Sequence, residues 1–229
     1  MMRRLFALTA AGIAGIVAFA VVPAFAITVW TNWTSATDGF PGSATGTLNG
    51  VGVTYSGEVI ASVTNGTSAI WAPNTSFIGG TVTASPSTVG DDIRLRGSFT
   101  GTNTITFASA IVDPVFAIWS LGAPGFGASF TFNQAPTFEV GGPNSQFGGG
   151  PLSVVGNVVS GAEGNGVVQF TGTLSSISWT DTPENFYAFT VGTAGTPVAG
   201  VPEPSTALLL GSGLGGLAGS VAWRARRRT

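Results

Sequence analysis

The residues best placed to do chemistry in this chain are two carboxylates in the segment Trp179-Thr180-Asp181-Thr182-Pro183-Glu184-Asn185. Hydrolysis of a glycosidic bond requires two carboxyl groups at a suitable separation, and Asp181 and Glu184 could supply them. Trp179 and Tyr187 flank the pair and could pack against the C–H faces of a sugar. The structural alternative is that Asp181 organises the turn before Pro183 while Glu184 is solvated. We favour that alternative, so these residues are candidates for a ligand site and no catalytic residue is assigned.

The composition excludes most other catalytic chemistry. The chain contains no histidine and no cysteine, and all of its basic residues are arginines. A His-based or Cys-based nucleophile therefore cannot be assembled, and the usual ligands of zinc and copper are missing. We expect a protein that is not an enzyme.

Hard, oxygen-binding cations such as Ca²⁺ are the metals that this composition leaves open. Asp91 and Asp92 could contribute two oxygens, with Asn103 or a turn carbonyl as a further ligand. The complete ligand spacing of a calcium loop is missing, however. We favour an acidic hairpin end flanked by Arg94 and Arg96, and we expect no bound metal or cofactor.

The N-terminal residues have the pattern of a secretory signal peptide. A short basic segment, Met1-Met2-Arg3-Arg4, precedes an apolar run over residues 5–22 and the sequence Ala24-Phe25-Ala26. Small residues at Ala24 and Ala26 are typical of the cleavage site that follows such a run. We predict a signal peptide over residues 1–26, cleaved after Ala26, with an uncleaved anchor as the alternative.

The C-terminal residues combine three features in a fixed order. Pro202-Glu203-Pro204 is followed by an apolar run over residues 207–223 and then by Arg224, Arg226, Arg227 and Arg228. The run is at the short limit for a helix that crosses a bilayer, which requires about 17–25 residues. Arginines cross hydrocarbon at a high free-energy cost, so they should stop transfer and remain cytoplasmic. We predict a single transmembrane helix over residues 207–223 with an arginine-rich cytoplasmic end.

This arrangement over residues 201–229 resembles the PEP-CTERM sorting signal of bacterial exported proteins. The resemblance implies that a membrane-embedded exosortase with a catalytic cysteine recognises Pro202-Glu203-Pro204 and processes the protein. An ordinary tail anchor is the alternative. Segments between residues 113 and 192 also resemble uncharacterised exported PEP-CTERM proteins, which implies a shared all-β domain and no known activity.

Residues 27–201 are acidic once the two terminal segments are set aside. Two arginines, Arg94 and Arg96, stand against nine acidic residues, which gives a formal charge of −7. Such a surface repels nucleic acid, whose binding needs clustered Lys and Arg, so we expect no nucleic-acid partner. Because no cysteine is available for disulfides, stability must come from a packed core.

The same residues consist of short runs with apolar side chains at every second position, a pattern that predicts half-buried strands. The inward positions are Val51, Val53 and Tyr55, then Ile93 and Leu95, Ile105 and Phe107, Phe130 and Phe132, Ile177 and Trp179, and finally Tyr187, Phe189 and Val191. Residues 115–119 are apolar throughout, so we predict a central strand covered on both faces. With glycine and asparagine turns between the runs, about ten to fourteen strands are expected in an all-β fold. We predict an antiparallel, jelly-roll-like β-sandwich over residues 27–192, followed by a linker over residues 193–200.

The expected function is that of a non-enzymatic exported protein at the cell surface or in the extracellular matrix, anchored in the membrane before processing. The alternative is a module that binds carbohydrate, such as an exopolysaccharide, through exposed tryptophans. Trp33, among polar residues, is predicted to be exposed, and Trp119, within an apolar run, is predicted to be in the core. A glycosidase that uses carboxylates is the third hypothesis.

Overall fold

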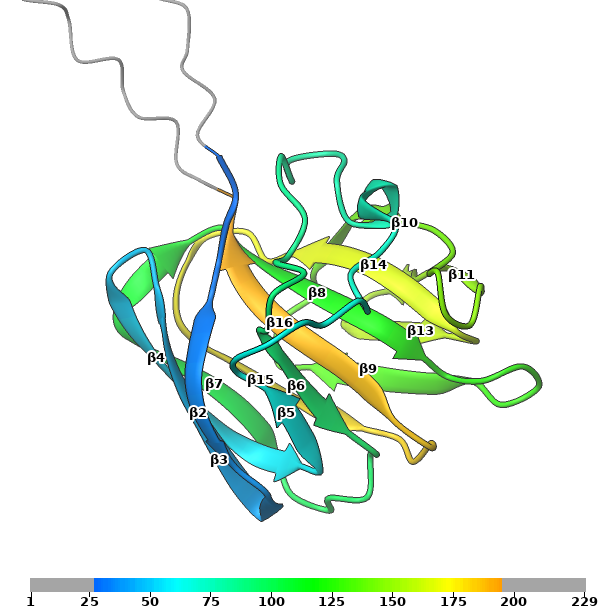
Figure 1. Ribbon diagram of the computed structural model, residues 1–229, viewed down its shortest axis with the longest axis horizontal. Helices are drawn as coiled ribbons and strands as arrows, with labels where there is room; N and C mark the ends of the chain where they lie inside the picture. The colour runs from blue at the N-terminus through cyan, green and yellow to red at the C-terminus, as the bar shows by residue number, and fades with distance from the viewer. Residues whose placement is uncertain (1–26, 195–229) are drawn as a thin grey trace, which may run out of the picture. The chain divides into compact units, whose positions relative to one another are not determined.

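The computed structural model describes residues 27–194, which form two β-sheets packed face to face (Figure 1). Sheet 1 consists, in spatial order, of β10 (Thr137–Gly141), β14 (Gly164–Gln169), β8 (Pro114–Leu121), β16 (Tyr187–Thr193), β6 (Asp92–Leu95) and β5 (Ala61–Val63), while β1 (Val29–Trp30) pairs with β16 and β11 (Gly150–Pro151) with β14. Sheet 2 consists of β12 (Ser153–Val155), β13 (Val158–Gly161), β9 (Ala128–Phe132), β15 (Thr173–Asp181), β7 (Asn103–Val112), β4 (Val51–Val59), β3 (Gly39–Leu48) and β2 (Asn32–Thr37). Every pairing is antiparallel except the short one between β11 and β14.

The prediction of an all-β antiparallel fold is therefore confirmed, and the jelly-roll-like topology stays a prediction. One 3₁₀ turn, η1 (Asn74–Ser76), is the helical element within residues 27–194. No helix in that range is long and apolar enough to span a membrane. β16 ends at Thr193, the first residue of the predicted linker. The predicted signal peptide, most of the linker and the predicted transmembrane helix lie outside the described residues.

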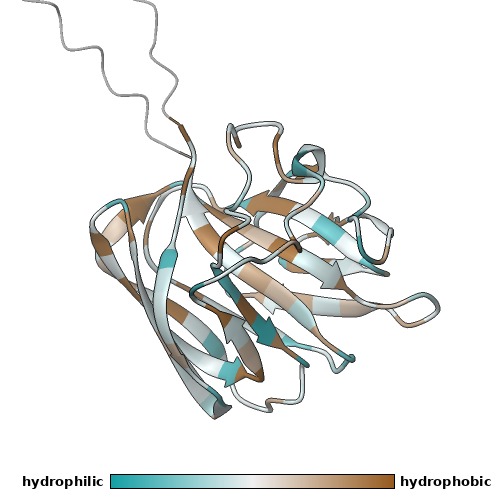
Figure 2. Ribbon diagram, viewed as in Figure 1, coloured by the Kyte–Doolittle hydropathy of each residue, from teal (hydrophilic) through white to brown (hydrophobic). Residues whose placement is uncertain are grey.

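The main core lies between the two sheets and is rich in aromatic rings. Phe116 of β8 is central to it, with its ring centroid 5.1 Å from that of Trp179 and 5.2 Å from that of Phe189. All the inward positions predicted from the alternation are buried there except Val51, which is half-buried. The predicted alternation thus identified the inner faces of both sheets, and Figure 2 shows the apolar residues along these strands.

A second apolar cluster covers the outer face of sheet 1. Trp71, Phe77 and Val82, from the segment of residues 64–91 between β5 and β6, pack on Trp119 and Ala188 of the sheet. β8 is buried along its whole length, as its apolar sequence predicted. β16 is also buried at every position, so the prediction that its alternation marks a half-buried strand is wrong. Small and hydroxyl-bearing residues at its outward positions are compatible with burial under a covering segment, which the period-two pattern does not detect.

The prediction that Trp33 is exposed is also wrong. Its side chain is fully buried, and its indole N–H donates to the hydroxyl of Thr190 at 3.1 Å. Its backbone N–H donates to the carboxylate of Asp91 at 2.8 Å. Trp33 is therefore a core residue although its neighbours in the sequence are polar. The ring packs edge-on against Phe189, 6.4 Å between centroids. Trp119 is in the outer cluster, as predicted for a core residue.

Candidate functional site

The four candidate ligand-site residues lie at the end of the sandwich where β15 passes into β16. Trp179 and Asp181 are two residues apart on β15, Tyr187 begins β16, and Glu184 lies in the connecting loop. Trp179 and Tyr187 are buried, and the Trp179 ring stacks on Tyr55 at 5.8 Å. Neither ring is available to pack on a sugar, so the predicted role of these two aromatics is not supported.

Asp181 belongs to a buried polar network. The side-chain amide of Asn103 donates to one carboxylate oxygen of Asp181 at 3.1 Å. The amide oxygen of Asn103 in turn accepts from the Tyr55 hydroxyl at 2.7 Å and from the backbone N–H of Glu58 at 2.9 Å. The Tyr187 hydroxyl lies 3.3 Å from the carbonyl of Thr182 and is also close enough to Asp181 to lower the pKa of that carboxyl.

Glu58 is the residue of this network that the sequence did not indicate. Its side chain is fully buried, with one oxygen accepting from the backbone N–H of Ser98 at 3.0 Å and the other unpartnered. Position 58 is out of phase with the inward positions Val53 and Tyr55, so the alternation gives no reason to expect this glutamate in the interior. No signal in the sequence could have placed this acid beside Asp181.

Burial raises the pKa values of both candidate carboxyls. It raises the pKa of Asp181 to about 6, and the nearby Glu58 carboxylate adds to the rise. It raises the pKa of Glu184 to about 7, against the lowering effect of the hydrogen bond that the Gly122 backbone N–H donates to it. Burial likewise raises the pKa of Asp91. A glycosidase needs one carboxyl that stays protonated and one that stays ionised, and both members of this pair are shifted in the same direction.

These shifts predict that the folded protein is more stable in mild acid than at pH 8. A carboxyl with a raised folded-state pKa contributes stability that is complete below its unfolded pKa, near 4, and lost as pH rises through its folded pKa. We expect the melting temperature to fall between pH 4.5 and 7.5. Asp181→Asn keeps an acceptor for Asn103 and should remove on the order of 2–3 kcal/mol of this pH dependence. Thermal melts of the parent protein and of Asp181→Asn across this pH range test the prediction. Parallel curves of melting temperature against pH for the two proteins would contradict it.

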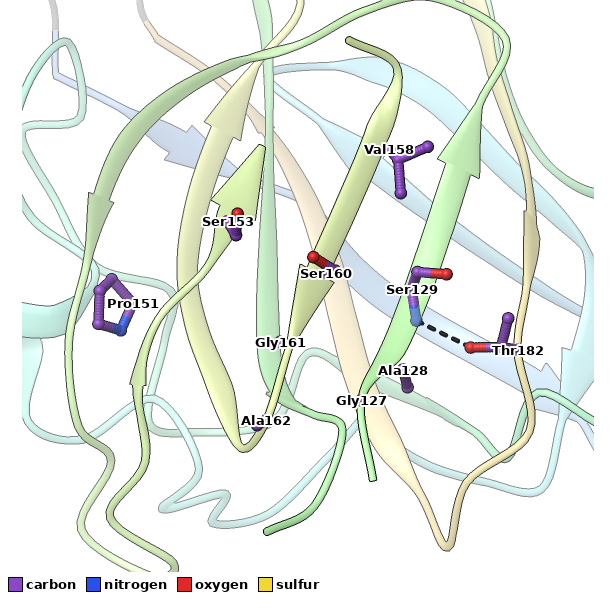
Figure 3. Close-up of a pocket in the computed structure, with 10 residues that line it drawn as sticks. All are labelled: Gly127, Ala128, Ser129, Pro151, Ser153, Val158, Ser160, Gly161, Ala162 and Thr182. Carbon is purple, nitrogen blue, oxygen red and sulfur yellow. Dashed lines mark hydrogen bonds between the residues drawn. The ribbon is translucent and has the colours of Figure 1, made fainter. Parts of the chain in front are cut away.

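Neither of two depressions on the described surface contains both carboxylates. A shallow depression of about 250 Å³ is lined by Glu184 with Ala123, Phe126, Pro183 and Asn185, and Asp181 is not among its residues. A larger, open groove of about 610 Å³ contains neither carboxylate. Four of the residues that line this groove carry hydroxyls, Ser129, Ser153, Ser160 and Thr182, and the others are glycine, alanine, proline and valine (Figure 3).

The acids proposed for calcium are engaged in structural contacts. Asp92 is buried, 2.8 Å from the guanidinium of Arg94, and accepts a hydrogen bond from Ser68. Asp91 accepts from the backbone of Trp33, and Asn103 belongs to the network around Asp181. Within residues 27–194 no three acidic side chains are grouped as a metal site would need. The contacts favour the structural interpretation of Asp91 and Asp92, while Arg94 is half-buried rather than fully solvated.

The comparison with protein families finds a sorting motif in the C-terminal residues. Residues 200–228 match the PEP-CTERM protein-sorting motif. The chain thus carries an all-β domain ahead of a PEP-CTERM sorting motif, and this motif implies exosortase-dependent sorting of an exported protein. The earlier resemblance is confirmed for this segment, which includes Pro202-Glu203-Pro204. No curated protein and no solved structure matches the chain.

Proposed function

We propose that this protein is a non-enzymatic component of the cell surface or the extracellular matrix. In this proposal the signal peptide is removed after Ala26, and residues 207–223 hold the precursor in the membrane with Arg224, Arg226, Arg227 and Arg228 in the cytoplasm. An exosortase-type enzyme recognises Pro202-Glu203-Pro204 and processes the precursor. The observation that carries the proposal is the sorting motif at residues 200–228.

A non-enzymatic role is supported by what the acidic side chains do within the sandwich. Asp92 pairs with Arg94, and Asp181 accepts from Asn103 inside a buried network. The depression lined by Glu184 does not include Asp181, which argues against a glycosidase that uses this pair. The proposed role requires no cofactor, no Ca²⁺ and no nucleic acid.

Carbohydrate binding is the second candidate function, and the observation that favours it is the open groove with four hydroxyl side chains rather than the aromatic residues. Four of the six tryptophans are fully buried, which removes the original basis of that hypothesis. Any sugar ligand would be held by hydrogen bonds from serine and threonine.

Fractionation of the producing bacterium with and without its exosortase-type enzyme tests the proposal. We expect the parent strain to carry a shortened form at the surface or in the medium, and the deletion strain to accumulate the longer precursor in its inner membrane. Identical fractionation in both strains, or protein confined to the cytoplasm, would overturn the proposal.

A further inference from the structure

The outer face of sheet 2 carries hydroxyl side chains in rows that cross the strands. One row, in register from β2 to β15, consists of Ser35, Thr45, Thr54, Thr106 and Ser176. The next row consists of Thr37, Ser43, Ser56, Thr104 and Ser178. All ten side chains are exposed or half-buried. Because residues two apart on a strand point to the same side, both rows lie on one surface.

The rows continue toward the other edge of the sheet. Thr180 of β15 pairs with Thr131 of β9, and a further row joins Ser129, Ser160 and Ser153 of β9, β13 and β12. These last three hydroxyls line the open groove shown in Figure 3. The hydroxyl surface therefore extends over all eight strands of the sheet.

This surface is uncharged. The acidic residues within the strands of sheet 2 are Glu58, which is fully buried, and Asp181, which joins the inner network. The aromatic rings of β4, β7, β9 and β15 point into the core. A charged ligand would meet no opposite charge on these rows, and no ring of these four strands is available for stacking.

The hydroxyls retain hydrogen-bonding capacity for an outside partner. Ser35 pairs with Thr45 at 2.7 Å and Thr104 with Ser178 at 3.1 Å, but each hydroxyl has one proton and two lone pairs. Neighbouring strands are about 4.8 Å apart, and side chains on one face of a strand repeat about every 6.8 Å. The surface is thus a two-dimensional array of donors and acceptors.

We propose that the outer face of sheet 2 binds an extended, uncharged polysaccharide chain lying across the strands. Such a chain presents neutral hydroxyls at regular intervals, which matches both the chemistry and the lack of charge of this face. Each protein–sugar hydrogen bond replaces a bond to water and gains little, so binding depends on many contacts made by one chain.

The twist of the sheet favours a flexible chain over a planar lattice such as ice. Neighbouring strands rotate by about 20–25°, and Figure 1 shows how strand direction changes between β2 and β13. A polysaccharide chain can follow this turn across several strands, whereas a flat crystal plane meets only a few of them.

The proposal rests on the proposed function only in that the domain must face the outside of the cell.

Native affinity electrophoresis of the full chain in mild detergent tests this assignment, with dextran, galactomannan or mixed-linkage β-glucan cast into the gel and alginate as the acidic comparison. We expect retardation by at least one neutral polymer and none by alginate. The double variant Thr54→Val, Thr106→Val removes two central hydroxyls while keeping β-branched side chains. It should weaken binding about tenfold.

Two matched variants make the result specific. Thr54→Ser with Thr106→Ser keeps the hydroxyls and should retain binding, and Thr67→Val with Thr137→Val changes exposed threonines outside sheet 2 and should leave it unaltered. The assignment is overturned if no neutral polymer retards the protein, or if Thr54→Val with Thr106→Val binds normally. Ice-crystal shaping that this variant abolishes would also overturn it, assigning the face to ice. Because the assay is independent of processing, failure here leaves the proposed function standing.

Discussion

Replacing Glu203 by alanine is expected to stop processing almost completely while leaving export and membrane insertion intact. The variant removes the only charged side chain of the Pro-Glu-Pro motif, and it leaves the apolar run over residues 207–223 and the terminal arginines unchanged. Insertion depends on hydrophobicity and on the positive charge that remains in the cytoplasm, so it should proceed normally. Immunoblots of membrane and extracellular fractions should show full-length precursor held in the inner membrane.

Asp38→Ala is a suitable control, because it removes an exposed acid between β2 and β3 and keeps the motif. It should be processed like the parent. Replacing Arg226 to Arg228 by alanine should act differently, by weakening cytoplasmic retention of the predicted transmembrane segment, whose apolar run is at the short limit for crossing a bilayer. Processing of Glu203→Ala at the parental rate would mean that Pro-Glu-Pro is not the recognised element, and the tail would then be an ordinary anchor.

The second large effect is expected in the core, where Phe116→Ala should destabilise the domain by about 3–5 kcal/mol. Phe116 is fully buried on β8, and its ring packs against aromatic rings of both sheets. Its ring centroid lies 5.3 Å from that of Phe132 and 5.1 Å from that of Trp179. With no disulfide to limit the unfolded chain, this loss is a large share of a stability of about 5–15 kcal/mol.

Urea denaturation followed by tryptophan fluorescence measures this change. Val155→Ala is the matched control, because Val155 is 74% exposed on the edge strand β12 and should cost less than about 0.5 kcal/mol. If Phe116→Ala lost less than about 1 kcal/mol, the ring would not be at the centre of a close-packed core.

The inner faces of the sheets could be predicted from the sequence because each inward position is specified locally, by alternation. The burial of β16 on its outer face could not, because it depends on Trp71 and Phe77 folding back from a distant segment. The burial of Trp33 could not be predicted for a similar reason, because its contact partners Phe189 and Thr190 are distant in the sequence.

The candidate sites show the same limit. The sequence identified Asp181 but not Glu58, because the two acids meet only when β4 and β15 are assembled on either side of β7. The hydroxyl rows were not predicted, although their members alternate along single strands, as Ser43 does with Thr45 and Ser176 with Ser178. Their alignment into rows depends on strand register, and register is fixed by the whole sheet rather than by any one strand.

The intact mass of the protein recovered from outside the cell is the most direct measurement of how this chain is sorted. Removal of a signal peptide and processing at the sorting motif predict a single species that begins at Ile27 and lacks the arginine-rich end. A species that still contains Arg224 to Arg228 would contradict sorting through the PEP-CTERM motif.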